Sequence, residues 1–252
     1  MGENKHLISI IVPCFNAQDY INDFFASLYS QKWHNWECLI YEDGSQDKSR
    51  NMLLEYAKKD HRIRIILADV NLGISNALNK LIEMSEGDII CRMDIDDLFY
   101  GTRRFERTVL ALKDANFCFG NAVAFNSSWT RYTSVNSSEK VDVNILSKGR
   151  LIHPTFAFRS EVKNVVIYKD EYNRVEDTVL WYELFVIGPY KYSIIPHNLI
   201  WYRARKKRGR PYRKTQKAAL RFILNNKKNI ECISLFRILT LRIIRYFGSF
   251  IF

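Results

Sequence analysis

The sequence is poor in glycine and proline, which number ten and five among its 252 residues. A flexible low-complexity linker is therefore not expected. The five cysteines are scattered, and none stands in a CxxC pair or in a zinc-binding spacing. This pattern favours free thiols in a reducing cytosol. The N-terminus lacks a long apolar segment behind a basic start, so no signal peptide is expected.

What the sequence does contain is a large share of apolar and aromatic residues, at 47% and 14%. A chain of this length and composition can form one sizeable packed domain, alone or with a tail. The net charge of +11 is unevenly distributed, because residues 201–252 hold 15 Lys or Arg and one acid. This end of the chain is thus +14, which leaves −3 for residues 1–200. A mildly acidic domain is followed by a strongly basic extension.

Short apolar segments alternate with helical patterns in the first part of the chain. The segments expected to be buried strands are residues 7–12, 36–41, 63–67 and 88–93. The segments with helical spacing are residues 19–30, 48–58 and 75–84. This alternation predicts βαβ units and a mostly parallel α/β sheet. Ligands bind such sheets beyond the carboxyl ends of the strands, and polar residues such as Asn16, Asp43 and Asp94 stand there.

The second part of the chain continues the alternation less regularly. Residues 102–112 and 175–187 are expected to be helical, and residues 117–125, 155–159 and 190–202 to be extended. Residues 126–140 are rich in Ser, Thr and Asn, which predicts a surface loop. Strands and helices are therefore expected up to about residue 202.

Three carboxylates, Asp94, Asp96 and Asp97, follow the apolar run at residues 89–91. Mg²⁺ and Mn²⁺ prefer oxygen ligands, and one or two carboxylates together with substrate phosphates can hold them. Carboxylates two positions apart converge where a strand bends into a turn, as this strand end should. Taken alone, the motif is equally consistent with a solvated turn.

Six motifs stand along the chain in a particular order and spacing: Ser9–Ala17, Tyr41–Asp47, Asn71–Ser75, Glu86–Asp88, Arg92–Asp97 and Val175–Trp181. Together they resemble family 2 glycosyltransferases with the GT-A fold, of the bacterial surface-polysaccharide type. The resemblance covers about residues 7–203. It implies a Rossmann-like, mostly parallel sheet flanked by helices, with a nucleotide-binding half at about 1–98 and an acceptor half at about 99–203. Residues 204–252 would then be a basic, amphipathic helical extension.

The resemblance also implies roles for single residues. Those expected to bind the donor are Pro13, Phe15, Asn16, Asp43, Asp94, Asp96 and Asp97. Asp43 should bind the base of a nucleotide sugar, which is uracil if the donor is a UDP-sugar. Asp94 and Asp96 match the family's DxD pair, the expected Mn²⁺ or Mg²⁺ ligands, with Asp96 touching the metal and Asp94 nearer the ribose or sugar. Asp97 should support the donor sugar.

Asp177 matches the aspartate of the family's ED motif, the expected general base. A carboxylate beside the anomeric carbon can deprotonate an acceptor hydroxyl, and a metal on the diphosphate stabilises the leaving group. One base with direct attack inverts the anomeric centre, whereas double displacement needs a second carboxylate as nucleophile. By spacing alone, Glu176 and Asp177 are also explained as negative charge at a helix N-terminus.

Four further residues are candidates for contacts with the acceptor or a phosphate: His153, Glu176, Trp181 and Arg203. A lone histidine such as His153 is more often structural, and Trp181 is expected to pack in the core next to Asp177, with acceptor contact as its alternative. Many family members carry a histidine two residues after the Tyr-Arg pair that Tyr202 and Arg203 match, but here Arg205 stands in its place. The third metal ligand is therefore open.

The extension contains eight Lys or Arg in residues 203–214 and an apolar segment at residues 235–252. On a helical projection the three arginines of this segment lie on one side, so a basic amphipathic helix at a membrane interface is expected. The arginines also make a spanning helix unlikely. The alternative is a helix packed on the catalytic domain. Charge alone would allow nucleic-acid binding, but no such module is recognisable.

These observations predict a metal-dependent inverting glycosyltransferase. It would move a sugar from a nucleotide sugar, such as a UDP-sugar, to a hydroxyl of a glycan acceptor that is lipid-linked. It would be cytoplasmic and bound peripherally to the inner leaflet of the cytoplasmic membrane. One alternative is a non-catalytic nucleotide-sugar or glycan-binding protein on the same fold. A nucleotidyltransferase is a third hypothesis, but residues 13–16 do not supply the Gly-rich, basic phosphate loop that it would need.

Overall fold

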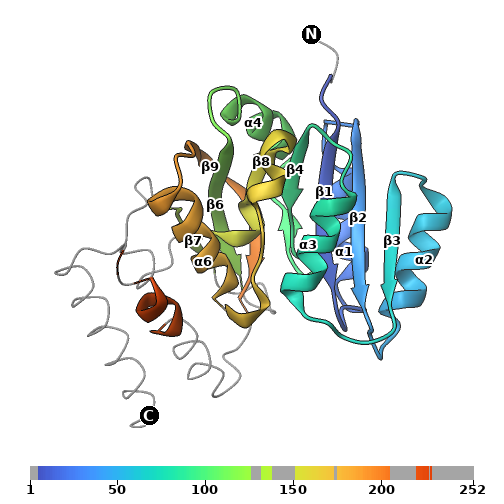
Figure 1. Ribbon diagram of the computed structural model, residues 1–252. Coiled ribbons are helices and arrows are strands. Elements are labelled where there is room, and N and C mark those ends of the chain that lie inside the picture. The colour runs from blue at the N-terminus through green and yellow to red at the C-terminus, as the bar shows by residue number, and fades with distance from the viewer. Residues whose placement is uncertain are drawn as a thin grey trace.

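The computed structural model describes residues 5–125, 132–137, 151–172, 175–204, 220–226 and 228. Within these residues, nine strands form one continuous sheet (Figure 1). The strand order is β3-β2-β1-β4-β8-β6-β9-β5, with β7 paired to β6. The predicted mostly parallel sheet is thus confirmed, with antiparallel additions in its second half.

The first half of the sheet is parallel. Its strands are β1 (Ile8–Cys14), β2 (Trp36–Asp43), β3 (Ile63–Ala68) and β4 (Ile89–Arg92). The connecting helices are α1 (Ile21–Tyr29), α2 (Ser49–Lys59) and α3 (Ile74–Met84). All seven predicted elements are confirmed to within three residues at either end. The first strand was expected at residues 7–12, but it continues through Pro13 to Cys14.

The second half mixes strand directions. Its strands are β5 (Leu98–Phe99), β6 (Phe117–Phe125), β7 (Tyr132–Val135), β8 (Ala157–Arg159) and β9 (Tyr192–Arg203). Its helices are α4 (Arg104–Ala111) and α6 (Glu176–Tyr182), the latter continued by a π-helical turn, η4 (Glu183–Ile187). Short 3₁₀ turns lie at η1 (His153–Thr155), η2 (Ser160–Val165) and η3 (Asp170–Tyr172). Residues 126–140 were predicted to be a loop. This was wrong at β7, whose backbone forms an antiparallel ladder with β6.

Two apolar layers hold the sheet between helices. On one face, α3 and α6 pack against side chains such as Ile11, and on the other face α1, α2 and α4 pack against side chains such as Ile10. Neighbouring residues of β1 thus serve opposite faces, as strand geometry requires. Figure 1 shows α3 in front of β1 and β2. Each fully buried aliphatic side chain contributes about 1.5–3 kcal/mol relative to an exposed one.

One part of the basic extension packs on this domain. Residues 220–225 are helical, and Phe222 and Ile223 are buried in the same layer as α6. The Phe222 ring meets the rings of Tyr172 and Tyr182 edge-on, at centroid distances of 5.2 and 5.4 Å. This part of the extension therefore packs on the domain. The predicted membrane helix at residues 235–252 lies outside the described residues.

None of the helices that the structure describes is both long and apolar enough to cross a membrane.

Candidate functional site

The carboxylate Asp94 is gripped by a buried arginine just before it. Arg92, the last residue of β4, directs Nη1 at Oδ2 of Asp94 and Nη2 at Oδ1, at 2.8 and 2.6 Å. The Arg92 side chain is only 3% exposed, while that of Asp94 is 26% exposed. A charge-assisted fork of this kind fixes a carboxylate firmly. Asp94 is thereby held in one orientation at the edge of the sheet.

Asp96 and Asp97 are tied to the far end of β9. The Asp97 Oδ1 atom accepts a hydrogen bond from the backbone N–H of Arg203 at 2.7 Å. The Nε of Arg203 donates to the backbone carbonyl of Asp96 at 2.8 Å. The Arg203 guanidinium lies 4.8 Å from the ring centroids of Tyr20 and Phe125. Arg203, expected to face a phosphate, is therefore built into the support of the acidic turn.

The pKa of Asp97 is strongly perturbed. Burial, with the nearby charges of Asp94 and Asp96, raises the pKa of Asp97 well above its ordinary value. Its Oδ2 atom is buried without a hydrogen-bond partner in the described chain. Two of the three carboxylates of the turn, Asp96 and Asp97, are thus buried, and Asp94 is partly exposed.

The ends of β1 and β2 are joined by a polar network. Asn16 has a positive φ of 49°; its backbone N–H donates to Ser45 Oγ, and its Oδ1 accepts from the backbone N–H of Gln46. Phe15 is 46% exposed, so its ring is accessible from outside the domain. Pro13 lies within β1 and pairs with Tyr41 of β2. The predicted nucleotide-pocket residues therefore lie together at one edge of the sheet.

Asp43 holds a loop in place. Its two carboxylate oxygens accept hydrogen bonds from the backbone N–H groups of Leu72 and Gly73, at 2.7 and 2.9 Å. Gly73 has a φ of 88°, and a Cβ at Gly44 would lie 2.8 Å from the backbone of Val70. The loop after β3 therefore packs directly against the end of β2, through Asp43 and a glycine.

Asp177 lies in the first turn of α6 and is half-buried. Its Oδ1 accepts hydrogen bonds from the backbone N–H and the hydroxyl of Thr178, at 2.6 and 3.2 Å. Burial nevertheless raises the pKa of Asp177, and the charge of Arg92 opposes this shift. Glu176, beside it, is 7% exposed. A carboxylate with a raised pKa is a suitable proton acceptor.

His153, Tyr168 and Trp181 form a cluster beside Asp177. His153 Nε2 and the Tyr168 hydroxyl are 2.8 Å apart, and the His153 ring meets Trp181 edge-on at 5.7 Å. Burial and the charge of Arg92 hold the pKa of His153 well below its ordinary value, so the ring is neutral. Trp181 is 1% exposed and packs in the core, which confirms the expected packing.

Three residues of the site were not assigned a role from the sequence. Tyr168 lies within electrostatic reach of Arg92, Asp94 and Asp177. Arg92 was quoted only as part of a motif, and Arg104 not at all, although both are buried. The sequence signal that could have found Arg92 was its position directly after the apolar run Ile89–Cys91, at the end of a predicted buried strand.

The donor set fits a divalent cation shared with a substrate. No group of three His, Cys, Asp or Glu side chains is arranged around a metal position within the described residues. The crowding of Asp94, Asp96 and Asp97, with a buried unpartnered oxygen on Asp97, is what a cation would relieve. Mg²⁺ typically takes one or two carboxylates and completes its shell with phosphates and water. A cation held by Asp96 and Asp94 would therefore need a diphosphate and water to complete its shell.

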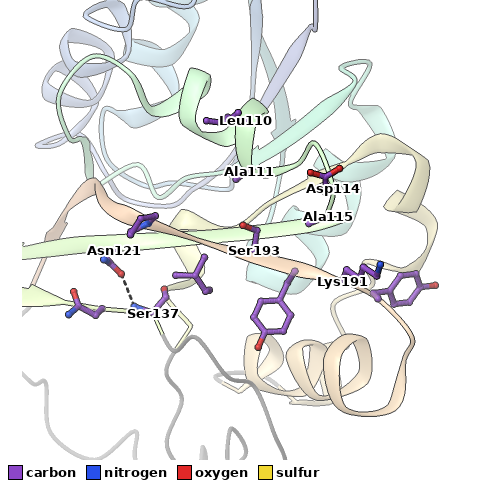
Figure 2. A pocket seen from close by; sticks show the side chains of 13 residues that line it. Leu110, Ala111, Asp114, Ala115, Asn121, Ser137, Lys191 and Ser193 are labelled. Carbon is purple, nitrogen blue, oxygen red and sulfur yellow. Dashed lines mark hydrogen bonds between the residues drawn. The ribbon is translucent and has the colours of Figure 1, made fainter.

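A cavity of about 1030 Å³ lies apart from these residues. Figure 2 shows it between Ala111, at the end of α4, and Lys191 and Ser193, at the start of β9. Asn121 and Ser137 also line it and are joined by a hydrogen bond of 3.0 Å. No predicted donor or catalytic residue contributes to it. The candidate site is defined by side chains at the strand ends, and this cavity is not part of it.

Known proteins resemble the chain over part of their length. TuaG of Bacillus subtilis, assigned to teichuronic acid biosynthesis, is 39% identical over 93 residues, which are 37% of this chain and 37% of TuaG. WfgD of Escherichia coli, named a UDP-Glc:α-D-GlcNAc-diphosphoundecaprenol β-1,3-glucosyltransferase, is 30% identical over 126 residues. That match covers 50% of this chain and 49% of WfgD. The chain thus aligns with half or less of either relative.

Solved structures share the fold at low identity. Staphylococcus aureus TarS 1–349 in complex with UDP-GlcNAc superposes with a TM-score of 0.67 at 17% identity, over 96% of this chain and 72% of that one. The mannosyltransferase PcManGT from Pyrobaculum calidifontis, in complex with GDP-Man and Mn²⁺, gives 0.66 at 15%, over 97% and 71%. These likenesses show the predicted GT-A fold. A family model described as Glycosyl transferase family 2 matches residues 9–175, more than half of the chain. The chain belongs to glycosyltransferase family 2.

Proposed function

We propose that this glycosyltransferase moves a sugar from a UDP-sugar to a hydroxyl of a lipid-linked glycan, with inversion at the anomeric carbon and with Mn²⁺ or Mg²⁺ as cofactor. The observation that carries this proposal is the meeting of two distant carboxylate groups around one buried arginine. Arg92 grips Asp94 directly and lies within electrostatic reach of Asp177, 85 positions away in the sequence. An acid-rich donor edge and a potential base would then face one reaction space.

On the donor side, the base would lie between the ends of β1 and β2, beside the exposed ring of Phe15. Asp43 would face the base from the end of β2, while its present bonds to Leu72 and Gly73 keep the neighbouring loop close. The diphosphate would extend toward Asp96 and Asp94, which would hold the cation with it. A bound cation would stabilise the charge that develops on the leaving diphosphate.

On the acceptor side, Asp177 would accept the proton of the attacking hydroxyl. Its raised pKa makes it a stronger base than an exposed aspartate, and the Thr178 bonds hold Oδ1 so that Oδ2 can face the acceptor. General-base catalysis of this kind typically contributes about 10²–10⁴-fold. A single base with direct displacement produces inversion. His153 and Glu176, which lie beside Asp177, would contact the acceptor.

The relatives support the substrate classes. TarS binds UDP-GlcNAc, PcManGT binds GDP-Man and Mn²⁺, and the name of WfgD specifies UDP-Glc and a diphosphoundecaprenol-linked acceptor. A lipid-linked acceptor requires the enzyme to work at a membrane surface. The basic residues of the extension after residue 203 would bind the anionic inner leaflet of the cytoplasmic membrane.

The test is release of UDP from UDP-glucose and UDP-N-acetylglucosamine, with Mn²⁺ and a GlcNAc-diphosphate lipid as acceptor. Wild-type protein should release UDP in a metal-dependent manner, and Asp177→Asn should reduce the rate at least 100-fold. Glu183→Gln is the control, because Glu183 is the next acid along the same helical segment and pairs with Lys169 on the surface. Metal-independent release, or an Asp177→Asn variant as active as the control, would contradict the proposal.

A further inference from the structure

Arg104, the first residue of α4, is fully buried. Its Nη2 donates hydrogen bonds to the backbone carbonyl of Arg92 at 2.7 Å and to that of Pro154 at 2.9 Å. Its Nη1 lies 2.9 Å from the sulfur of Met93, and its guanidinium lies 5.2 Å from the ring centroid of Phe99. One side chain thus contacts the end of β4, the short strand β5 and the turn η1.

The partners of Arg104 are unusual for a buried cation. Among the described residues, no carboxylate lies at ion-pair distance from it, and its Nε has no hydrogen-bond partner. Burying a charge without a paired ion costs several kcal/mol. An apolar side chain of similar volume would fill this space equally well. Packing alone therefore does not explain why a guanidinium is buried here.

The two carbonyls that Arg104 joins belong to the two sides of the candidate site. Arg92 is the residue whose own guanidinium grips Asp94, and Pro154 follows His153 directly. Arg104 therefore fixes the backbone under the donor carboxylates relative to the backbone under the His153–Tyr168 pair. A shift of about 1 Å between such groups can cost about 100-fold in rate.

We infer that Arg104 is a positioning residue, which sets the distance between the acidic turn at Asp94–Asp97 and the turn at His153–Thr155. The inference rests on the proposed function, because it takes these two turns as the donor and acceptor sides of one reaction. Arg104 itself touches no substrate. Its effect passes through the Arg92 carbonyl on one side and the Pro154 carbonyl on the other.

The chain offers a matched control in Arg159. This arginine also donates to two backbone carbonyls, those of Leu112 and Lys113, at 2.7 and 3.3 Å. It lies at the end of β8 where the strand pairs with Ile89, at the start of β4, so it is at the opposite edge of the sheet from Asp94. Arg159→Met removes the same kind of contacts far from the site.

The first arm of the test is amide hydrogen exchange on Arg104→Met, Arg104→Lys and Arg159→Met. Arg104→Met should raise exchange at least tenfold in both turns, residues 93–97 and 153–156, and Arg104→Lys should restore part of the protection. Arg159→Met should raise exchange near residues 112–116 only. Unchanged exchange in the two turns of Arg104→Met would overturn the inference, whatever the enzyme's activity.

The second arm is UDP release from UDP-glucose and UDP-N-acetylglucosamine by the same variants. In Arg104→Met, kcat should fall about 100-fold, with a smaller change in KM and with partial recovery in Arg104→Lys. Equal kcat values in Arg104→Met and Arg159→Met would overturn the inference. Absence of release by the wild type would count against the proposed function, and the exchange arm would still decide the role of Arg104.

Discussion

The carboxylates at the ends of β1 and β2 differ in their surroundings from those at the end of β4 and the start of α6. Burial works against the charge of Asp47, but hydrogen bonds from Ser49 and Gln18 outweigh it and lower its pKa. For Asp97 and Asp177, burial outweighs the hydrogen bonds and raises the pKa. The two groups of acids lie at one edge of one sheet.

This difference distinguishes two kinds of acid. Organising acids hold neighbouring loops in place through hydrogen bonds, and the other acids would be available for chemistry. In the β1–β2 region, backbone N–H groups of neighbouring loops bind the carboxylates, as Leu72 and Gly73 bind Asp43. Such bonds stabilise the folded chain. In the β4–α6 region, Asp97 lies close to Asp94 and Asp96 and keeps one buried oxygen without a hydrogen-bond partner among the described residues. Burial also raises the pKa of Asp177, so holding these acids in their charged form costs stability.

The largest effect is expected on ligand binding at the β4 end. Asp96→Asn should weaken Mn²⁺-dependent binding of UDP about 100-fold, because it removes the charge that would hold the cation against the diphosphate. Isothermal titration calorimetry with and without Mn²⁺ measures this change. Asp88→Asn, an exposed acid before the same strand, is the control. Equal UDP affinities in the two variants would remove Asp96 from the metal site.

The next largest effect is expected on the free energy of unfolding, when an organising acid loses its charge. Asp43→Asn replaces one of two accepting oxygens by an NH₂ group, which faces a backbone N–H and cannot accept from it. The free energy of unfolding should fall by about 1–3 kcal/mol. Urea unfolding checks this value, with the exposed Asp69→Asn as control, expected to change by less than about 0.5 kcal/mol. An unchanged free energy of unfolding in Asp43→Asn would contradict this difference between the β1–β2 and β4–α6 regions.

A change of opposite sign is expected at Asp97. Asp97→Asn removes a buried charge close to Asp94 and Asp96 while keeping an oxygen for the Arg203 N–H. The free energy of unfolding should rise by about 1 kcal/mol, at the low end of gains seen when buried charge is replaced. UDP turnover should fall in the same variant. A loss of stability in urea would show that the Asp97 charge supports the fold.

The smallest effect concerns pH. Because His153 has a folded-state pKa below its unfolded value, the unfolded chain binds more protons as the pH falls below about 6.5. The stability present above that pH is then lost on acidification from pH 7 to pH 5. His153→Gln should reduce this dependence, whereas the exposed His34→Gln should not. Parallel pH profiles for all three proteins would contradict a neutral His153.

The sequence predicted the first half of the fold well, because βαβ units have local signals. The apolar runs of β1 to β4 and the helical spacing of α1 to α3 each lie within a dozen residues. The position of β7 was missed, since its composition is polar and its pairing with β6 is a tertiary contact. The π-helical turn after Tyr182 was likewise not signalled by periodicity.

The candidate site was predicted as a set of residue types but not as a network. The motif pattern identified Asp94, Asp96 and Asp177, and the fold brings their segments together. The partners that tune them, Arg92 and Tyr168, are contacts between distant segments. Whether a buried arginine binds a carboxylate, as Arg92 does, or two carbonyls, as Arg104 does, depends on packing that no local pattern encodes.

The acids of the β4–α6 region are expected to serve chemistry at the expense of stability. The most direct test measures UDP release and urea unfolding on one preparation of Asp177→Asn. The rate should be at least 100-fold below wild type, with a free energy of unfolding that is equal or higher. A variant that keeps its rate but loses stability would show instead that Asp177 organises the fold, as Asp43 does.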